Sequence, residues 1–289
     1  MHHLPRILTG ALVAALTVLG VVTAGGAAAN ASPAQATSRP APSAATAAAL
    51  TIIKQLKVGG HATDQRMPGF TRVKGLSQVE STNWSGYADT GSSFGQVAGS
   101  WSEPGATCSS RSTTYAAFWV GIDGYSSDSV EQDGTLIECY EGTAYQYSWW
   151  EMYPTNDIQV VGESVAAGDA IAASVVRSGD SYTLKVTDST HSANSFTTTQ
   201  TCSDCANSSA EWIAEAPCCT NSGGILPLAD FGTWTESGAT VTEGSTSGVI
   251  SSFTDEEITM VDNSGLVKAQ PGSLNGSDNG FSVTWERSS

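Results

Sequence analysis

The sequence predicts an all-β protein, a sandwich or jelly roll of antiparallel strands. Apolar and polar residues alternate in short runs such as 182–187 and 281–286, which is the pattern of half-buried strands. Turn pairs such as Gly168-Asp169 and Gly179-Asp180 separate these runs, and clear helical periodicity is missing. Residues 80–289 have a length that suits one domain, so we expect a single catalytic or binding sandwich.

The first 31 residues have the organisation of a secretory signal peptide. Arg6 precedes an apolar run, Ile7 to Val22, and small residues follow up to an A-x-A cleavage site at Ala29-Asn30-Ala31. A membrane anchor is the alternative, but the run is short and lacks a charged stop-transfer flank. We therefore expect a secreted, extracellular protein.

Residues 32–79 are predicted to be a basic propeptide. They are rich in Ala, Ser, Thr and Pro, become helix-like around 45–57, and contain neither Trp nor Cys. Their charge is +5, because Asp64 is opposed by six basic residues: Arg39, Lys54, Lys57, Arg66, Arg72 and Lys74. The remainder, 81–289, has 26 acidic and five basic residues, a formal charge of −21. The propeptide is thus a candidate inhibitor that docks near neutral pH and dissociates when carboxylates are protonated.

The acidic domain has too few cations to bind nucleic acid or an anionic membrane, since phosphate contacts need basic surface. Its charge favours an acidic environment, because protonation at low pH relieves repulsion among carboxylates. The alternative is that acidity serves only solubility.

All six cysteines lie in the acidic domain, and an even number in a secreted protein predicts disulfides. The preferred pairing joins Cys108 to Cys139 and cross-links the 202/205 pair to the 218/219 pair. A zinc site is the competitor, because Cys202-x-x-Cys205 has the right first half, but adjacent Cys218 and Cys219 lack the usual ligand spacing.

Three predicted strands carry aromatic and carboxylate side chains on the face opposite the expected core. In 117–123 the core face is Phe118, Val120 and Ile122, which turns Trp119 and Asp123 the other way. The other two strands contribute Tyr145, Tyr147, Trp149, Glu151 and Tyr153, and then Glu211, Ile213 and Glu215. This face is typical of a cleft for an extended polymer; the alternative is that the aromatics belong to the core.

Several catalytic classes are poorly supported. His191 is the one histidine after residue 80, which leaves little for a Ser-His-Asp triad, a Cys-His pair or His-based metal catalysis. The G-x-S-x-G match at 91–95 lacks the strand-turn-helix setting that this motif needs. Asp89-Thr90-Gly91 is similar to the loop of pepsin-like peptidases, but no second copy supplies the partner carboxylate.

Six ordered blocks resemble the glutamic peptidase (eqolisin) family and span nearly all of 80–289: 81–87 (STNWSGY), 118–124 (FWVGIDG), 130–134 (VEQDG), 149–154 (WWEMYP), 209–215 (SAEWIAE) and 228–232 (LADFG). The resemblance implies a concanavalin-like sandwich of two antiparallel sheets. It also implies an acid endopeptidase that uses no metal or cofactor and is insensitive to pepstatin. Its catalytic pair would be Gln132 and Glu211, and its substrate-binding residues Trp84, Trp119, Tyr147, Trp149, Glu151 and Tyr153.

These two side chains suit peptide hydrolysis by water. Glu211 can take a proton from the attacking water and return it to the leaving amine, while Gln132 holds the water and donates to the oxyanion. No covalent intermediate is needed, and hydrogen bonds are expected to keep the pKa of Glu211 low. Two residues depart from the family pattern: Glu131, a rival to Gln132, and Tyr147, which stands where an Asp is expected.

The alternative function is carbohydrate binding or glycoside hydrolysis, in which Glu151 and Glu211 would be the carboxyl pair. A binding protein without catalysis is a third hypothesis. For the peptidase we expect polypeptide substrates, the protein's own propeptide as inhibitor, and a monomer.

Overall fold

Strands dominate the chain, as the alternation predicts. The structure is a computed structural model that describes residues 43–54, 78–218 and 224–289, all within the unit Pro42–Ser289. The expected signal peptide lies outside the described residues. The described residues form one α-helix, α1 (Ala44–Ile53), and two 3-10 turns, η1 (Ser192–Asn194) and η2 (Ile250–Ser252). Their strands are β1 (Gln78–Ser81), β2 (Trp84–Thr90), β3 (Phe94–Ser102), β4 (Thr114–Ile122), β5 (Val130–Tyr140), β6 (Thr143–Tyr153), β7 (Asn156–Gly162), β8 (Ala170–Ser178), β9 (Ser181–Asp188), β10 (Phe196–Thr201), β11 (Ser209–Glu215), β12 (Thr233–Glu243), β13 (Thr246–Gly248), β14 (Thr254–Val261), β15 (Val267–Pro271) and β16 (Gly280–Trp285).

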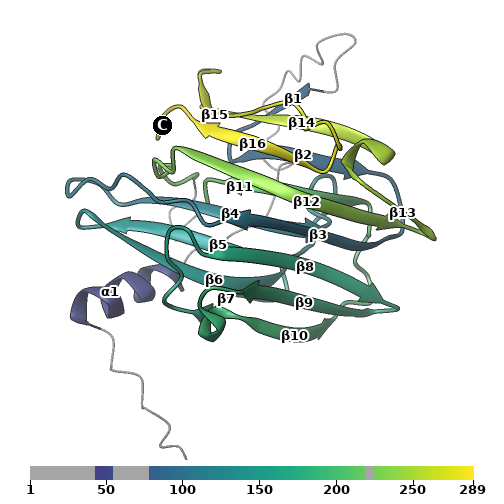
Figure 1. The fold of residues 1–289 in the computed structure, drawn as a ribbon, viewed down its shortest axis with the longest axis horizontal. Helices are drawn as coiled ribbons and strands as arrows, with labels where there is room; N and C mark the ends of the chain where they lie inside the picture. Colours follow the sequence, from purple (N-terminus) through teal and green to yellow (C-terminus); the bar gives the residue numbers. More distant parts are fainter. Residues whose placement is uncertain (1–42, 55–77, 219–223) are drawn as a thin grey trace, which may run out of the picture. The chain divides into compact units, whose positions relative to one another are not determined.

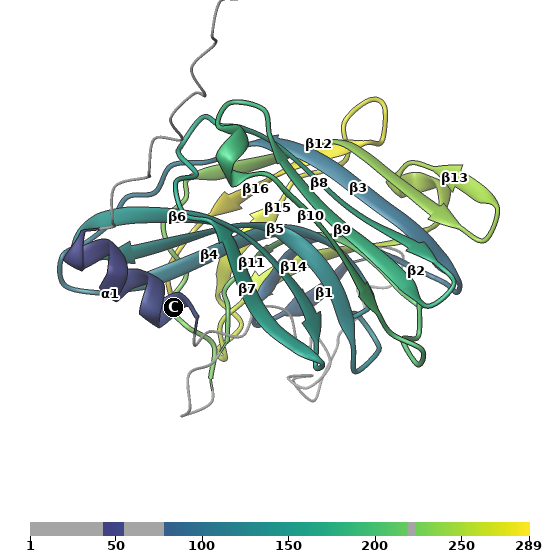
Figure 2. The ribbon, with the colours of Figure 1, turned by 90° about the horizontal axis from the view of Figure 1, so that it is seen from below.

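The strands form two layers that are continuous through one hydrogen-bonded path (Figures 1 and 2). One layer runs β14-β2-β11-β4-β5-β6-β7, and the other runs β16-β12-β3-β8-β9-β10. β15 pairs with both β14 and β16 and so joins the layers. Neighbours are antiparallel except that β1 pairs in parallel with β14. The predicted sandwich is confirmed, and the predicted propeptide boundary at residue 79 falls within β1.

The main core lies between the two layers. β4 and β11 contribute Phe118 and Trp212, and the opposite layer contributes Val175, Leu184 and Trp234. The ring of Phe118 stacks on that of Trp234, with centroids 5.5 Å apart. Packing of this kind uses one face of each strand, so the other face of the β4–β5–β6 layer is available for a second cluster.

That second cluster is rich in tryptophan and includes part of α1. Ser43 caps the helix, its hydroxyl accepting a hydrogen bond from the backbone N–H of Thr46. Leu50 and Ile53 are buried one helical turn apart and belong to the cluster. The predicted helix-like stretch around 45–57 is therefore confirmed where it is described, over Ala44–Ile53. Among the described residues, no helix is both long and apolar enough to cross a membrane.

The disulfides agree with the sequence expectation in part. Cys108 pairs with Cys139, as predicted. Cross-linking of the 202/205 pair to the 218/219 pair is wrong, because Cys202 is bonded to Cys205. The two Cα atoms are 5.7 Å apart across a tight turn, a separation that a disulfide bridges readily. Cys218 is also disulfide-bonded, and Cys219 lies outside the described residues. Because Cys202 and Cys205 are bonded to each other, the competing zinc site lacks these two of its four thiolates.

Several carboxyl groups are buried in the sandwich without a basic partner. Burial raises the pKa of Glu103 to about 8, although Thr135 and Trp101 donate hydrogen bonds to it. Burial, and next the charge of Asp255, raises the pKa of Asp89 to about 8. Burial also places the pKa of Asp133 well above its ordinary value. These groups are neutral in the folded protein at acidic pH.

We predict that the protein is most stable in acid and loses stability as pH rises. Between about pH 4 and pH 8 the unfolded chain releases these protons while the folded chain keeps them, so the free energy of unfolding falls with pH. Asp89→Asn removes one such group. At about pH 8 the free energy of unfolding should rise by on the order of 2 kcal/mol, which raises Tm by roughly 4–8 °C. At about pH 4 Tm should change little.

Thermal melts of the wild type, Asp89→Asn and the exposed control Glu286→Gln across this pH range measure the effect. If Asp89→Asn kept the pH slope of the wild type, ionisation of Asp89 would not be what destabilises the fold.

Candidate active site

Four neighbouring strands bring three predicted site residues into one row. Glu211 of β11 pairs with Gly121 of β4, Gly121 pairs with Gln132 of β5, and Gln132 pairs with Glu151 of β6. Directly paired residues project from the same face of a sheet, so the three side chains share one face. Figure 1 shows the four strands side by side in this order.

Gly121 leaves the middle of the row without a side chain. A Cβ atom there would lie 2.9 Å from the Trp119 ring, 3.2 Å from Cβ of Gln132 and 3.3 Å from the carbonyl oxygen of Glu131. Glycine therefore lets the Trp119 ring and Gln132 pack directly over the backbone between Glu211 and Gln132. The face pattern of the sequence did not single out this residue, although a glycine in the middle of an aromatic strand is a signal.

Glu151 fixes the amide of Gln132. Nε2 of Gln132 donates a 2.8 Å hydrogen bond to Oε2 of Glu151, and both side chains are fully buried. A bond from one amide N–H to a carboxylate holds the amide plane and sets which way its oxygen points. Glu151 is thus a positioning residue for Gln132, a role that the sequence did not assign to it.

Glu211 is buried, and its pKa lies well above the ordinary value. Desolvation is the main cause, and a hydrogen bond from Ser209 only partly opposes it. The expectation that hydrogen bonds keep this pKa low is therefore wrong. The charges of Asp123, Glu131 and Asp89 raise the pKa further.

Tryptophans form one wall beside the row. Trp119 and Trp149 flank Gly134 of β5, where any Cβ would collide with the carbonyl oxygen of Phe118. Trp84 contacts Trp119 edge to face, with ring centroids 5.0 Å apart. Nε1 of Trp119 donates a 2.8 Å hydrogen bond to Glu215, which fixes the ring.

The remaining predicted residues fall in different places. Tyr147 lies in the same buried cluster as Trp149. Tyr153 ends β6, is partly buried, and lies outside that cluster. Glu131 pairs with Ile122 and so points to the core face, away from Gln132, which removes it as a rival at this site.

The row argues against a glycosidase pair. Glu151 and Glu211 are three strand spacings apart, roughly 14 Å between their backbones. A retaining glycosidase places its two carboxyl groups about 5 Å apart. Gln132 and Gly121 occupy the positions between them, so the amide and not a second carboxyl faces Glu211.

Asp123 organises one end of the site and was not assigned a role from the sequence. Its carboxylate accepts hydrogen bonds from the backbone N–H groups of Asn207 (2.7 Å) and Ser208 (2.8 Å). Ser208 leads directly into β11, which carries Glu211. Asp123 thereby fixes the start of that strand.

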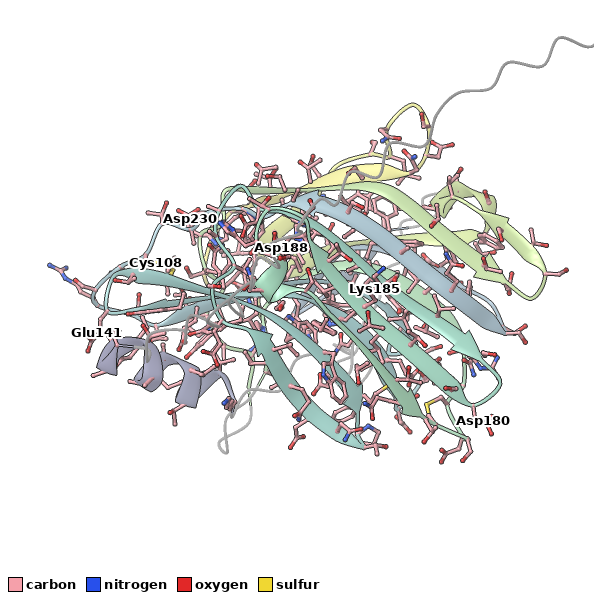
Figure 3. All side chains as sticks on the ribbon, turned by 60° about the horizontal axis from the view of Figure 1, so that its bottom comes forward. Cys108, Glu141, Asp180, Lys185, Asp188 and Asp230 are labelled. Atoms are coloured by element: carbon pink, nitrogen blue, oxygen red, sulfur yellow. A yellow bond between two sulfur atoms is a disulfide. The ribbon has the colours of Figure 1, made fainter. Side chains whose placement is uncertain are left out.

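Two groups of side chains in the described part of the chain bring potential metal ligands within 4.8 Å of one another. One is Glu131 with Cys202 and Cys205, whose sulfur atoms are bonded to each other. The other is Asp169, Asp188 and His191 at the ends of β8 and β9, where Figure 3 labels Asp188, and none of these three belongs to the row. Nδ1 of His191 is 2.8 Å from Asp169, so the histidine is engaged in a pair away from Gln132 and Glu211.

The protein is thus a β-sandwich whose outer face carries an amide and a carboxyl group in one row beside a tryptophan wall. Residues 82–284 match the Peptidase A4 family, the glutamic peptidases or eqolisins, and the chain belongs to that family. It is a peptidase by this membership.

The chain is similar to two fungal peptidases. It is 26% identical over 220 residues to aspergillopepsin-2 of Aspergillus niger, covering 66% of this chain and 77% of that one. It is 27% identical over 186 residues to scytalidopepsin B of Scytalidium lignicola, covering 62% and 70%.

The fold agrees with two solved structures. Scytalido-glutamic peptidase bound to a transition state analog inhibitor has a TM-score of 0.61 at 22% identity, covering 71% of this chain and 98% of that one. Aspergilloglutamic peptidase from Aspergillus niger has a TM-score of 0.51 at 26% identity, covering 60% and 99%.

We predict that Gly121→Ala lowers kcat/KM by about a hundredfold, because the added methyl group would press against the Trp119 ring and Gln132 and displace them. The control is Gly95→Ala on β3, where a Cβ would meet no atom within 4 Å. Peptide cleavage in acid measures activity, and circular dichroism and Tm report whether each variant folds. Full activity of a folded Gly121→Ala protein would contradict the assigned row.

Proposed function

We propose that the protein is a secreted acid endopeptidase in which Gln132 and Glu211 add water to a peptide bond without metal, cofactor or covalent intermediate. The observation that supports this most strongly is the row Glu211–Gly121–Gln132, with one carboxyl group and one amide on either side of a glycine. The tryptophan wall next to the row offers apolar surface along which an extended polypeptide can lie.

The raised pKa of Glu211 determines the protonation state of the proposed reaction. In acid the resting carboxyl group is protonated. Its hydroxyl donates a proton to the scissile carbonyl oxygen while its other oxygen takes a proton from the attacking water, whose oxygen bonds to the carbonyl carbon. The product is a neutral tetrahedral diol, and Glu211 again carries one proton.

Collapse of the diol uses the same group in the opposite sense. Glu211 donates its proton to the leaving nitrogen and accepts one from a diol hydroxyl as the C–N bond breaks. Gln132, held by Glu151, orients the water and donates a hydrogen bond to the carbonyl oxygen. The charge that develops on that oxygen is small, so a neutral amide suffices.

Glu211→Gln and Gln132→Ala should each lower kcat by about 10³-fold, because each removes a proton-transfer or polarising group. Glu286→Gln and Gln159→Ala, at exposed positions, are the matched controls. Cleavage of a denatured protein in acid with pepstatin present is the assay, and we expect pepstatin to have no effect.

The pH profile is the second readout. With Glu211 acting in its protonated form, kcat/KM should fall as pH rises through its raised pKa. A rate that instead rose with pH across this range would mean that the ionised carboxylate is the active form. Near-normal turnover by either dyad variant would contradict the proposed pair itself.

The second part of the proposal is that the propeptide inhibits the enzyme. Leu50 and Ile53 of α1 pack in the same cluster as Trp119, Tyr147 and Trp149, so the helix occupies surface that a substrate would need. Apolar contact thus adds to the charge attraction expected from the +5 segment. Protonation of carboxylates in acid would weaken the charge attraction and leave the apolar contact unchanged.

We predict that Leu50→Asp with Ile53→Asp abolishes the lag before peptide cleavage begins when the full chain is acidified. The reason is that two buried apolar side chains are replaced by carboxylates, which cannot be buried against tryptophan rings without a large penalty. The control pair is Ala48→Asp with Thr51→Asp, which changes exposed positions of the same helix by the same charge. Equal lags in the two double variants would contradict inhibition through this apolar face.

A further inference from the structure

The ring of Trp119 lies directly on the row that carries the proposed catalytic pair. Trp119 and Gly121 are two residues apart on β4, so both project from the same face of the sheet. A Cβ atom on Gly121 would meet the six-membered part of the Trp119 ring at 2.9 Å. Gly121 is paired with Glu211 on one side and with Gln132 on the other. A change in the orientation of this ring would therefore change the surface between the two groups.

Glu215 holds the ring in its orientation. The Glu215 side chain is buried near the end of β11, on the same face as Glu211, because the two residues are four apart. Its Oε2 accepts the 2.8 Å hydrogen bond from Nε1 of Trp119, whose ring is also buried. An indole has a single N–H group, so one fixed acceptor selects one ring orientation. Without that acceptor the buried N–H would lose its partner, a cost that a rotated ring can avoid.

The segment before β2 fixes Glu215 in turn. Nδ2 of Asn83 donates to Oε1 of Glu215 at 3.4 Å, and Oδ1 of Asn83 accepts from the hydroxyl of Ser81 at 3.0 Å. The backbone N–H groups of Asn83 and Trp84 both donate to that hydroxyl, at 3.3 and 3.1 Å. The backbone N–H of Ala216 donates to the carbonyl oxygen of Asn83 at 2.8 Å. This turn therefore keeps the Asn83 amide against the carboxyl group.

Glu215 reaches the row only through the tryptophan. Four residues of strand separate it from Glu211, roughly 13 Å, which is too far for proton transfer with the reacting atoms. Trp84, the cross-strand partner of Glu215, packs edge to face on Trp119 with ring centroids 5.0 Å apart. The Trp119 ring is thus held at its N–H by a carboxyl group and supported on one side by a second ring.

We propose that Glu215 is a positioning residue for peptide hydrolysis, which acts by holding the ring of Trp119 against Gly121 between the two catalytic groups. The inference rests on the proposed function and adds a residue on which the geometry of the row depends. Asn83 has the same role one step further from the ring, through its hydrogen bond to Glu215.

The first test compares two substitutions of Glu215 in protein produced from the full-length chain and assayed for peptide cleavage in acid. Glu215→Leu has a similar volume but accepts no hydrogen bond, and it should lower kcat/KM by roughly tenfold. Glu215→Gln keeps an oxygen to which Nε1 of Trp119 can donate, so kcat/KM should stay within about threefold of the wild type. The control is Glu257→Leu, which removes a carboxyl group that accepts from Tyr87, and its kcat/KM should match the wild type.

Tm and circular dichroism report whether each variant folds, and Glu215→Ala replaces Glu215→Leu if the latter does not. Wild-type kcat/KM in a folded Glu215→Leu protein would overturn the proposal.

A double-mutant cycle with Trp119→Phe distinguishes positioning from a general effect on the fold. Phenylalanine has no N–H group for Glu215 to hold, so Glu215→Leu should cost less than about twofold in this background. A tenfold loss that persisted in the Trp119→Phe protein would mean that Glu215 does not act through the ring.

Hydrogen exchange of the Trp119 indole N–H separates this proposal from the proposed catalytic pair, since exchange needs no turnover. The indole signal in the NMR spectrum is the one that is missing from Trp119→Phe. Exchange should be equally slow in the wild type and in Gln132→Ala, and at least about tenfold faster in Glu215→Leu. Unchanged exchange in Glu215→Leu would overturn the positioning role, whatever the activity of the variants at Gln132 and Glu211.

Discussion

The pairing register of β11, β4, β5 and β6 is the constraint on which the rest of the structure depends. Because side chains alternate between the faces of a strand, a slip of one residue in β5 would exchange Gln132 for Glu131 at the row. The same slip would turn the core-facing residues of β5, such as Ile137, out of the core. Register alone therefore determines which carboxyl and amide groups lie side by side, whatever rotamers their side chains adopt.

The stability of this sandwich depends on pH because it buries acidic groups without cations beside them. Asp89, Glu103 and Asp133 face the interior, where neutral carboxyl groups are tolerated and ionised ones are not. Glu211 experiences the same desolvation on the opposite face of the sheet. Fold stability and the protonation state of the proposed catalytic group therefore respond to pH in the same direction.

Alternation in the sequence was enough to predict the sandwich and to place Glu211, Trp119 and Trp149 on one face, because strand periodicity is a local property. The order of strands across the layers is not local, so the row itself could not be derived. The Cys202–Cys205 pairing was missed because the sequence permits many connectivities. The direction of the pKa shift at Glu211 was missed because desolvation depends on what the other strands and loops place around it.

The Cys108–Cys139 bond has a practical consequence for making the protein. It joins the far end of β5 to a loop 31 residues earlier, a closure that stabilises a fold by roughly 3–4 kcal/mol in chain-entropy terms. A host that synthesises the chain in a reducing cytoplasm forgoes that contribution and exposes the strands of this hairpin region to aggregation during folding. Production should therefore be routed through an oxidising export compartment.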